Sequence, residues 1–144
     1  MRKIYVASSW RNLIQPTIVE QLRAAGHEVY DFRNPAPGNK GFGWSALGMG
    51  LSTDWSPAMT REALQHPISQ AGFKSDHDAM VWADTFVMVL PCGRSAHLEL
   101  GWACGAGKRT IILQIERQEP ELMYLEADSI CVSVAEMMRE LARP

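Results

Sequence analysis

Short apolar runs alternate with helix-like repeats along this chain of 144 residues. The first run, at 4–7, is followed by two serines and predicts a strand that ends in a loop. Apolar residues recur at helical spacing over 14–25 and stop at Gly26, and residues 27–32 alternate like a second strand. A strand, a helix and a second strand in this order usually begin a parallel α/β sheet.

The second half of the chain continues this alternation. Residues 85–90 form a continuous apolar run, which is typical of a strand buried on both faces. Ser95 is predicted to cap a helix that extends to about 106 and ends at Gly107. Later segments predict a fourth strand, a fifth strand and a closing helix, over 110–114, 129–133 and 134–142. We therefore expect one domain over 1–144, an α/β flavodoxin-like or Rossmann-like sandwich with a mostly parallel sheet of four to five strands.

The segment between the second and third strands has a different character. Residues 34–57 are rich in glycine and proline and predict a long irregular loop, which Trp44 and Trp55 can anchor by burial. Residues 59–65 predict a short helix. Residues 75–83 predict another, entered through a capping box formed by Ser75 and Asp78.

Composition narrows the classes of partner. The net charge is −2 with 47% hydrophobic and 21% charged residues, which fits a globular protein and gives no reason to expect a nucleic acid polymer or a membrane as partner. The N-terminal apolar stretch is too short for a signal peptide. Three cysteines without a CxxC pair make a disulfide framework and a zinc site poor explanations, so a cytoplasmic location is expected. The small net charge leaves a small neutral or phosphorylated ligand open.

Ligands of open parallel sheets bind beyond the carboxyl ends of the strands. Three polar segments fall there: Ser8, Ser9, Trp10 and Arg11 after the first strand, the long loop after the second, and residues 92–99 after the third. We expect these segments to contribute to a binding site.

Glu99 is the most unusual residue in that set. It is the only acid in a helix, 96–106, made otherwise of apolar or small residues with one histidine, and a helix that is apolar all round is predicted to be buried. A position near the helix N-terminus would favour its charged form, which a nucleophile needs. The alternative is that Glu99 only complements the helix dipole or pairs with Arg11, Arg94 or Lys108.

Asp76 is the second candidate acid. It precedes Met80 by four residues and Ala83 by seven, so it shares a helix stripe with residues expected to face the core. The alternative is an acid in the first turn of its helix, placed there by the dipole, with Ser75 and Asp78 as capping partners.

Gly93, Arg94 and Ser95, just before or at the start of the same helix as Glu99, resemble a small anion cradle. They would offer free N–H groups, a guanidinium and a hydroxyl. The same residues also suit an ordinary turn and N-cap, so both interpretations stay open here.

Three blocks of sequence are similar to the nucleoside 2-deoxyribosyltransferase family. Residues Lys3–Trp10 (KIYVASSW) resemble its first strand and loop, and Asp76 followed by Asp84 resembles its aspartate-bearing helix. Residues 97–103 (HLELGWA), followed by Gly107 and Lys108, resemble its Glu-Leu-Gly-x-Ala helix and exit. The blocks stand in family order over about 3–113.

The resemblance implies a flavodoxin-like fold and cleavage of an N-glycosidic bond, without a metal or organic cofactor. It implies Glu99 as the nucleophile, Asp76 near the nucleobase and its proton transfers, and Tyr5 as the residue that orients the glutamate. It matches Ser9 to a position that contacts sugar or phosphate in the nucleotide-hydrolase branch. A homodimer or larger homo-oligomer is also implied.

One position departs from the transferase branch, which has a second acid where this chain has Gly93. The basic and hydroxylic segment there makes a nucleoside 5′-monophosphate a plausible ligand. Two other functions stay open: an NAD-cleaving domain of the Toll/interleukin-receptor type, and a nucleotide sensor without turnover. Release of nicotinamide from NAD would identify the first, and a Glu99 locked in a salt bridge would favour the second.

Overall fold

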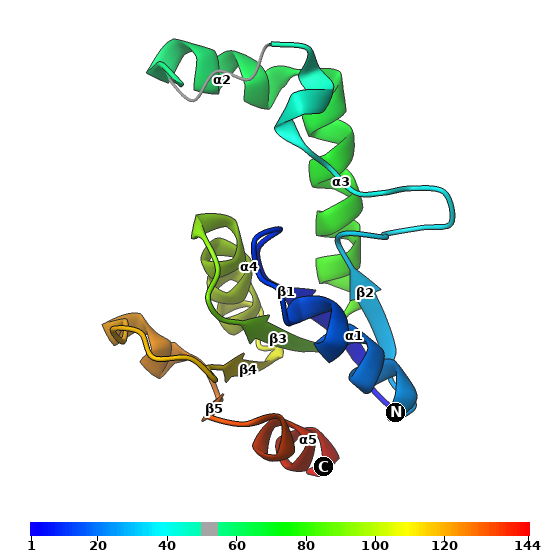
Figure 1. Cartoon of the computed structure of the whole chain (residues 1–144), viewed down its shortest axis with the longest axis vertical. Helices are drawn as coiled ribbons and strands as arrows, with labels where there is room; N and C mark the ends of the chain where they lie inside the picture. The colour runs from blue at the N-terminus through cyan, green and yellow to red at the C-terminus, as the bar shows by residue number, and fades with distance from the viewer. Residues whose placement is uncertain (50–54) are drawn as a thin grey trace.

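The computed structural model describes residues 1–49 and 55–144, arranged as a sheet with helices on both faces (Figure 1). The strands are β1 (Lys3–Ala7), β2 (Glu28–Asp31), β3 (Thr85–Val89), β4 (Arg109–Leu113) and β5 (Ser129–Cys131). The helices are α1 (Gln15–Ala24), α2 (Pro57–Gln65), α3 (Pro67–Trp82), α4 (Arg94–Gly105) and α5 (Val134–Ala142). Two 3₁₀ helices, η1 (Trp44–Leu47) and η2 (Leu122–Glu126), lie in the connections.

All the strand pairs are parallel, and the strand order is β2-β1-β3-β4-β5. This is the flavodoxin-like order, whose ligand site lies at the point between β1 and β3 where the order reverses. The predicted fold class and the predicted strand number are therefore confirmed.

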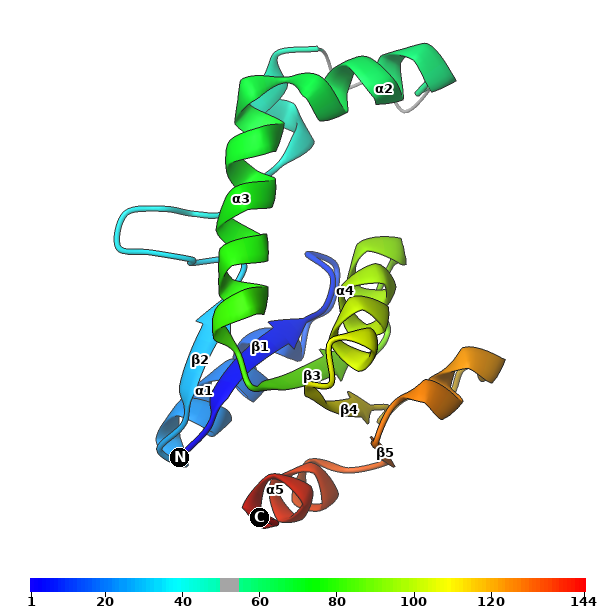
Figure 2. The same ribbon diagram turned by 180° about the vertical axis from the view of Figure 1, so that it is seen from behind.

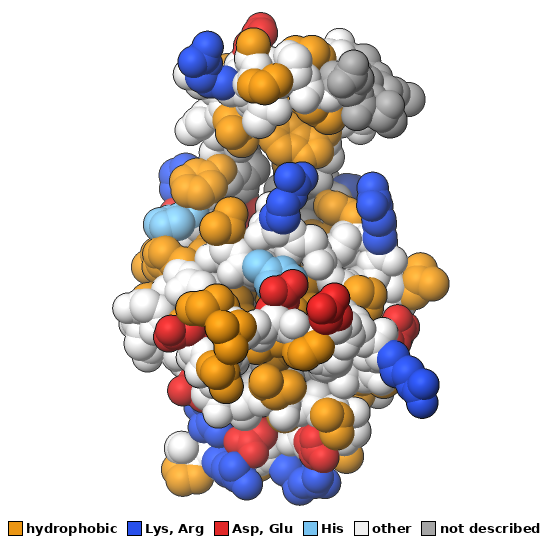
Figure 3. All heavy atoms as spheres, turned by 90° about the vertical axis from the view of Figure 1, so that its left-hand side faces the viewer, with side chains coloured by type: hydrophobic (Ala, Val, Ile, Leu, Met, Phe, Trp, Pro, Cys, Tyr) orange, Lys and Arg blue, Asp and Glu red, His pale blue; other side chains and the backbone are white. Residues whose placement is uncertain are grey.

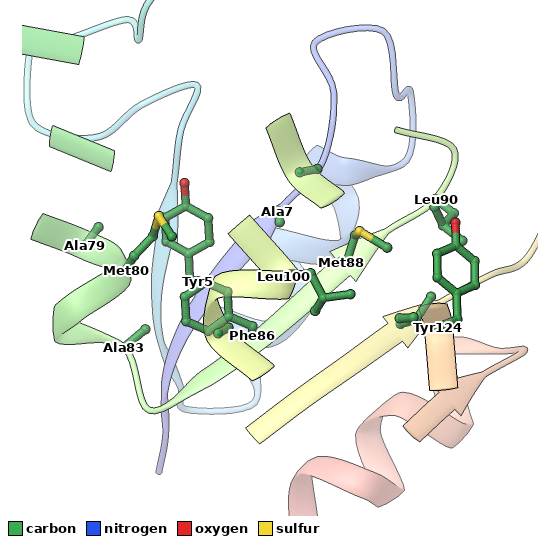
Figure 4. Packing of buried hydrophobic residues seen from close by; sticks show 13 residues of the cluster. Tyr5, Ala7, Ala79, Met80, Ala83, Phe86, Met88, Leu90, Leu100 and Tyr124 are labelled. Atoms are coloured by element: carbon green, nitrogen blue, oxygen red, sulfur yellow. The ribbon is translucent and has the colours of Figure 1, made fainter. Parts of the chain in front are cut away.

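Alternation along the strands produces two separate cores. Tyr5, Phe86 and Met88 face the side covered by α3 and α4, and Figure 4 shows them packed against Met80 and Leu100. The neighbouring positions along the strands face the other side, where α1 and α5 cover them. Because both faces are covered, the middle strands read as continuous apolar runs.

The helix that carries Asp76 is much longer than predicted. It begins at Pro67, with His66 as N-cap, rather than at Ser75. Pro67 and the His66 side chain, which accepts from the Ile68 N–H, supply the start signal. The predicted capping box at Ser75 and Asp78 is thus wrong, and so is the alternative that Asp76 is a first-turn acid. All three residues lie in the interior of the helix.

As a result, α3 projects well beyond the carboxyl edge of the sheet (Figure 2). Nine residues precede Asp76 in the helix, which corresponds to about 14 Å. The projecting half carries η1 and α2 with it, and these elements stand above the sheet edge where ligands are expected.

The helix that carries Glu99 also differs from its prediction. Its N-cap is Gly93 rather than Ser95, which is the second helical residue. Glu99 is therefore the sixth helical residue and lies in the second turn, where the helix dipole contributes little. The helix is not buried all round either, since Leu98 is 75% exposed.

The predicted irregular loop contains an ordered aromatic cluster. Phe42 packs edge-on against Trp44, and Trp44 against Trp55, with ring centroids 4.9 and 5.5 Å apart. Gly41 has φ +80°, and a Cβ there would come within 2.3 Å of the Phe32 carbonyl oxygen, so only glycine fits. Residues 50–54 of the predicted loop lie outside the described residues.

Other predicted boundaries agree with the structure to within a few residues. The helix predicted at 59–65 begins at Pro57 behind a Ser56 N-cap, and the closing helix spans 134–142 as predicted. Both 3₁₀ helices were missed. Over 1–49 and 55–144, none of the helices has the length and apolar character needed to span a membrane.

Candidate active site

Helices α3 and α4 form opposite walls of a cavity of about 670 Å³ beyond the sheet. Figure 3 looks onto the face that carries α4 and shows the molecule narrowing between its lower body and its upper part. Asp76 on α3 and Glu99 on α4 both line this cavity. Its other walls are largely apolar and include Phe42, Trp44, Phe73, Met80, Leu98 and Trp102.

Glu99 is partly buried, and this burial dominates its titration. Burial and the nearby negative charge of Asp76 raise the pKa of Glu99 to about 7. A hydrogen bond from the Tyr5 hydroxyl acts in the opposite direction, since it stabilises the charged form. Near neutral pH both the charged and the neutral form of Glu99 are therefore populated.

Asp76 lies in the same low-dielectric environment. Burial raises its pKa above the ordinary range, and a hydrogen bond from Tyr30 partly opposes this. The Tyr30 hydroxyl lies 2.8 Å from Asp76 Oδ1 and 3.1 Å from the Ser75 hydroxyl. Two carboxyl groups thus share one cavity. Asp76 has the Tyr30 hydroxyl as a hydrogen-bond partner, and the Tyr5 hydroxyl lowers the pKa of Glu99.

The two tyrosines belong to an aromatic ladder across the sheet. Tyr30 on β2, Tyr5 on β1 and Phe86 on β3 are in register on neighbouring strands. The Tyr5 ring stacks on Tyr30 at 5.3 Å and on Phe86 at 5.0 Å between centroids. Figure 4 shows the Tyr5 ring stacked near Phe86 and Met80. The ladder fixes where each hydroxyl points, because neither ring can turn without breaking the stack.

The cationic partners considered for Glu99 lie elsewhere. Among residues 1–49 and 55–144, no salt bridge includes Glu99. The Lys108 ammonium donates instead to the carbonyl oxygens of Val81 and Ala83. The interpretation of Glu99 as a dipole acid or as half of an ion pair therefore finds no support.

The loop that follows β1 lies beside this cavity rather than on its lining. The Ser8 hydroxyl donates to the Val89 carbonyl oxygen at 2.8 Å, and the Ser9 hydroxyl accepts from the Arg11 N–H. Trp10 packs edge-on against Phe32. None of Ser8, Ser9, Trp10 and Arg11 is on the lining of the cavity, so their role in binding stays a prediction.

The segment at the start of α4 reaches the cavity in part. Ser95 lines it together with Glu99. Arg94 lines an adjoining cavity of about 320 Å³ with Trp44, Trp55 and others, and Gly93 is exposed. Trp44 borders both cavities. The predicted anion cradle thus lies at one end of the candidate active site.

Several residues at or near the cavity were missed in the sequence. Tyr30 was seen only as part of a strand, and its bond to Asp76 depends on register and on the true length of α3. His77 and Trp102 both line the cavity and pack edge-on against each other, with ring centroids 5.7 Å apart. Within the described residues, no cluster of three or more His, Cys, Asp or Glu side chains could hold a metal ion.

The strand order and this carboxyl-lined cavity define a flavodoxin-like α/β protein with a candidate active site at its switch point. No family model and no curated protein sequence matches the chain. Solved structures do match its fold, and two of them cover most of the chain.

One is the 2-deoxyribosyltransferase of Bacillus psychrosaccharolyticus, with a TM-score of 0.56 and 19% identity, covering 93% of this chain and 88% of that one. The other is the CMP N-glycosidase BcmB of Clostridium botulinum, with a TM-score of 0.51 and 18% identity, covering 97% and 98%. These similarities establish the shared fold. The fold that the sequence resemblance implied is the fold that both neighbours have.

Replacing Glu99 by Gln should stabilise the protein at high pH and not at low pH. The folded-state pKa of about 7 exceeds the unfolded value, so the wild type loses stability as pH rises from about 4.5 to about 7. The Glu99→Gln variant has no carboxyl group at this position and does not lose this stability as pH rises. Its advantage in unfolding free energy at pH 8 should be on the order of 1–3 kcal/mol, and near zero at pH 4.5.

Thermal and urea unfolding at the two pH values measure this difference. Glu62→Gln on the exposed surface of α2 is the matched control and should show no pH-dependent gain. Equal effects of Glu99→Gln at both pH values would contradict a raised pKa at Glu99.

Proposed function

We propose that this protein cleaves or transfers the N-glycosidic bond of a nucleoside or a nucleoside 5′-monophosphate through a covalent glycosyl ester on Glu99. The observation that carries the proposal is the placement of Glu99 and Asp76 in one cavity, with the Tyr5 hydroxyl near enough to Glu99 to lower its pKa. A nucleophile and an acid that share a largely apolar cavity are what this reaction requires.

The first step forms one bond and breaks another. A Glu99 carboxylate oxygen attacks the anomeric carbon C1′ as the bond from C1′ to the base nitrogen breaks, through an oxocarbenium-like transition state. The bonding electrons leave with the base, and Asp76 supplies a proton to it. In the second step water or the N–H group of another base attacks C1′, the ionised Asp76 takes up the proton that this nucleophile loses, and Glu99 is released as a carboxylate.

The reaction requires one particular protonation state of the two carboxyl groups. The active form has an ionised Glu99 and a protonated Asp76, so the pair must hold one proton between them. Burial raises the pKa of both groups, so the pair holds a proton at a higher pH than ordinary carboxyl groups do, and attack requires that proton to be on Asp76. The Tyr5 hydrogen bond favours the ionised Glu99.

The choice of substrate class rests on three supports. The fold neighbours act, by their names, as a 2-deoxyribosyltransferase and a CMP N-glycosidase. Gly93 places no acid beside the first turn of α4, where an acid would repel a phosphate. Arg94 and Ser95 lie beside the N–H groups of that turn, and such groups bind anions readily.

A non-catalytic nucleotide sensor is a weaker explanation, because no salt bridge among the described residues locks Glu99. A cytoplasmic location, a homodimer or larger homo-oligomer, and one domain over 1–144 stay predictions from the sequence.

Glu99→Ala should abolish base release while leaving the fold intact. Loss of a covalent nucleophile should lower kcat by about 10³-fold or more. A screen of nucleosides and their 5′-monophosphates for released base, followed by chromatography, identifies the substrate and measures the loss. Circular dichroism checks the fold. Base release by the variant at more than a tenth of the wild-type rate would remove Glu99 from the nucleophile role.

Arg94→Ala should remove a preference for phosphorylated substrate. We expect the wild type to prefer a monophosphate over its nucleoside, and the variant to lose about 1.5–3 kcal/mol of that preference, the value of a hydrogen bond to a charged group. The ratio of kcat/KM for the two substrates measures it. Arg61→Ala, an exposed arginine on α2, is the matched control. Equal use of both substrates by the wild type would favour a nucleoside enzyme.

A further inference from the structure

The register of the sheet gives Tyr30 a position equivalent to that of Tyr5. The two residues are Cα partners on β2 and β1, and their rings are nearly parallel, with 16° between the planes. Tyr5 reaches the carboxyl group on α4, and Tyr30 reaches the carboxyl group on α3. Only Tyr5 has a role in the function proposed above.

We propose that Tyr30 is a positioning residue that holds Asp76 Oδ1, so that the proton of Asp76 is carried on Oδ2 for delivery to the leaving base. The proposal rests on the proposed function, because it assigns how the acid in that reaction is oriented. It rests on the 2.8 Å contact between the Tyr30 hydroxyl and Asp76 Oδ1, and on the stacking that fixes the ring.

The direction of the hydrogen bond decides where the proton lies. Burial raises the pKa of Tyr30, so its hydroxyl stays protonated and donates. A carboxyl oxygen that accepts this bond is a poor site for the acid proton, which therefore resides on the other oxygen. Asp76 Oδ2 accepts no hydrogen bond from the residues that the structure describes, which leaves it available to a substrate.

A second effect follows from the same bond. The Tyr30 hydroxyl stabilises the charged form of Asp76 and so lowers its pKa against the effect of burial. The other titratable groups around the pair are Tyr5 on β1, Glu99 on α4 and His77 on α3 itself. Tyr30 therefore moves the pH at which the two carboxyls give up their shared proton.

The Tyr30 ring is held in place by packing, which fixes the position of its hydroxyl. Tyr30 packs against the core on the α3 side, whereas Val29, one residue earlier, packs on the opposite side of the sheet. The Ser75 hydroxyl, 3.1 Å away, provides the phenol with a second contact on α3. The ring is thus held by the strand and its core contacts, and the hydroxyl by its contact with α3. The hydrogen bond from this fixed hydroxyl orients the Asp76 carboxyl group.

The test is the pH dependence of base release by Tyr30→Phe, which keeps the ring and removes only the hydroxyl. We expect kcat to fall about 10- to 100-fold with KM changed less than three-fold, because orientation is lost while the cavity is kept. The alkaline limb of the pH profile should move up by roughly one pH unit, since Asp76 holds its proton more tightly without this bond. Asp76→Asn should lack that limb.

Tyr124→Phe is the matched control. Its hydroxyl lies 2.9 Å from His97 Nε2 in a different cavity, so its removal costs a similar partly buried contact without touching Asp76. This control should keep the wild-type kcat within about two-fold and the alkaline limb in place. Carboxyl ¹³C NMR of Asp76 in substrate-free protein should show the same upward pKa shift in Tyr30→Phe alone.

The outcomes distinguish failure of the proposed function from failure of the role proposed for Tyr30. A wild type that releases no base from any nucleoside or monophosphate overturns the proposed function. An active wild type, together with a Tyr30→Phe variant of unchanged rate and alkaline limb, overturns the role of Tyr30 only. A variant with lower Tm and lower rate but an unmoved limb and an unmoved Asp76 titration also overturns it, since the hydroxyl would then act only on stability.

Discussion

Two carboxyl groups in one partly buried cavity repel each other, and the rest of the site depends on how this repulsion is managed. Asp76 and Glu99 come from different helices, and burial raises the pKa of both. Two charges in one low-dielectric cavity are costly to hold together, so the pair keeps a proton at a higher pH than ordinary carboxyl groups do. A pair that shares one proton can supply a nucleophile and an acid at once, which is the requirement of the proposed reaction.

The sheet supplies the framework for this pair. Tyr5 and Tyr30 stand on neighbouring parallel strands, so their separation is set by strand spacing and ring stacking rather than by a mobile loop. The Tyr30 hydroxyl donates to Asp76, the Tyr5 hydroxyl lowers the pKa of Glu99, and α3 and α4 bring the two carboxyl groups into one cavity over the switch point of the sheet. Both helices are held by the core beneath, which contains Met80 and Leu100.

The sequence predicted the framework well because periodicity is a local property. Apolar runs located the strands, and helical spacing located α1 and α5 to within a residue. Glu99 was identified because a lone acid stood among apolar neighbours, and Asp76 because it shared a stripe with core residues. Both residues line the same cavity.

The helix starts and the partner of Tyr30 could not be predicted, because they depend on more than local sequence patterns. A Ser-x-x-Asp sequence mimicked a capping box in the middle of α3, while the true start at Pro67 lay eight residues earlier, so the reach of the helix was missed. Gly93 displaced Ser95 as the N-cap of α4, which moved Glu99 out of the first turn. Tyr30 acquires its partner only through strand register and the length of α3, both of which are tertiary properties.

The central claim, that Glu99 forms a bond to the sugar, is tested most directly by trapping that bond. A 2′-fluorinated nucleoside monophosphate suits the purpose, because fluorine destabilises the oxocarbenium-like transition state and slows release of the ester. Peptide mass spectrometry of the acid-quenched protein should show the mass of the fluorinated glycosyl group on Glu99, with one equivalent of base released per site. Release of base with no adduct, or with an adduct on another residue, would contradict the account.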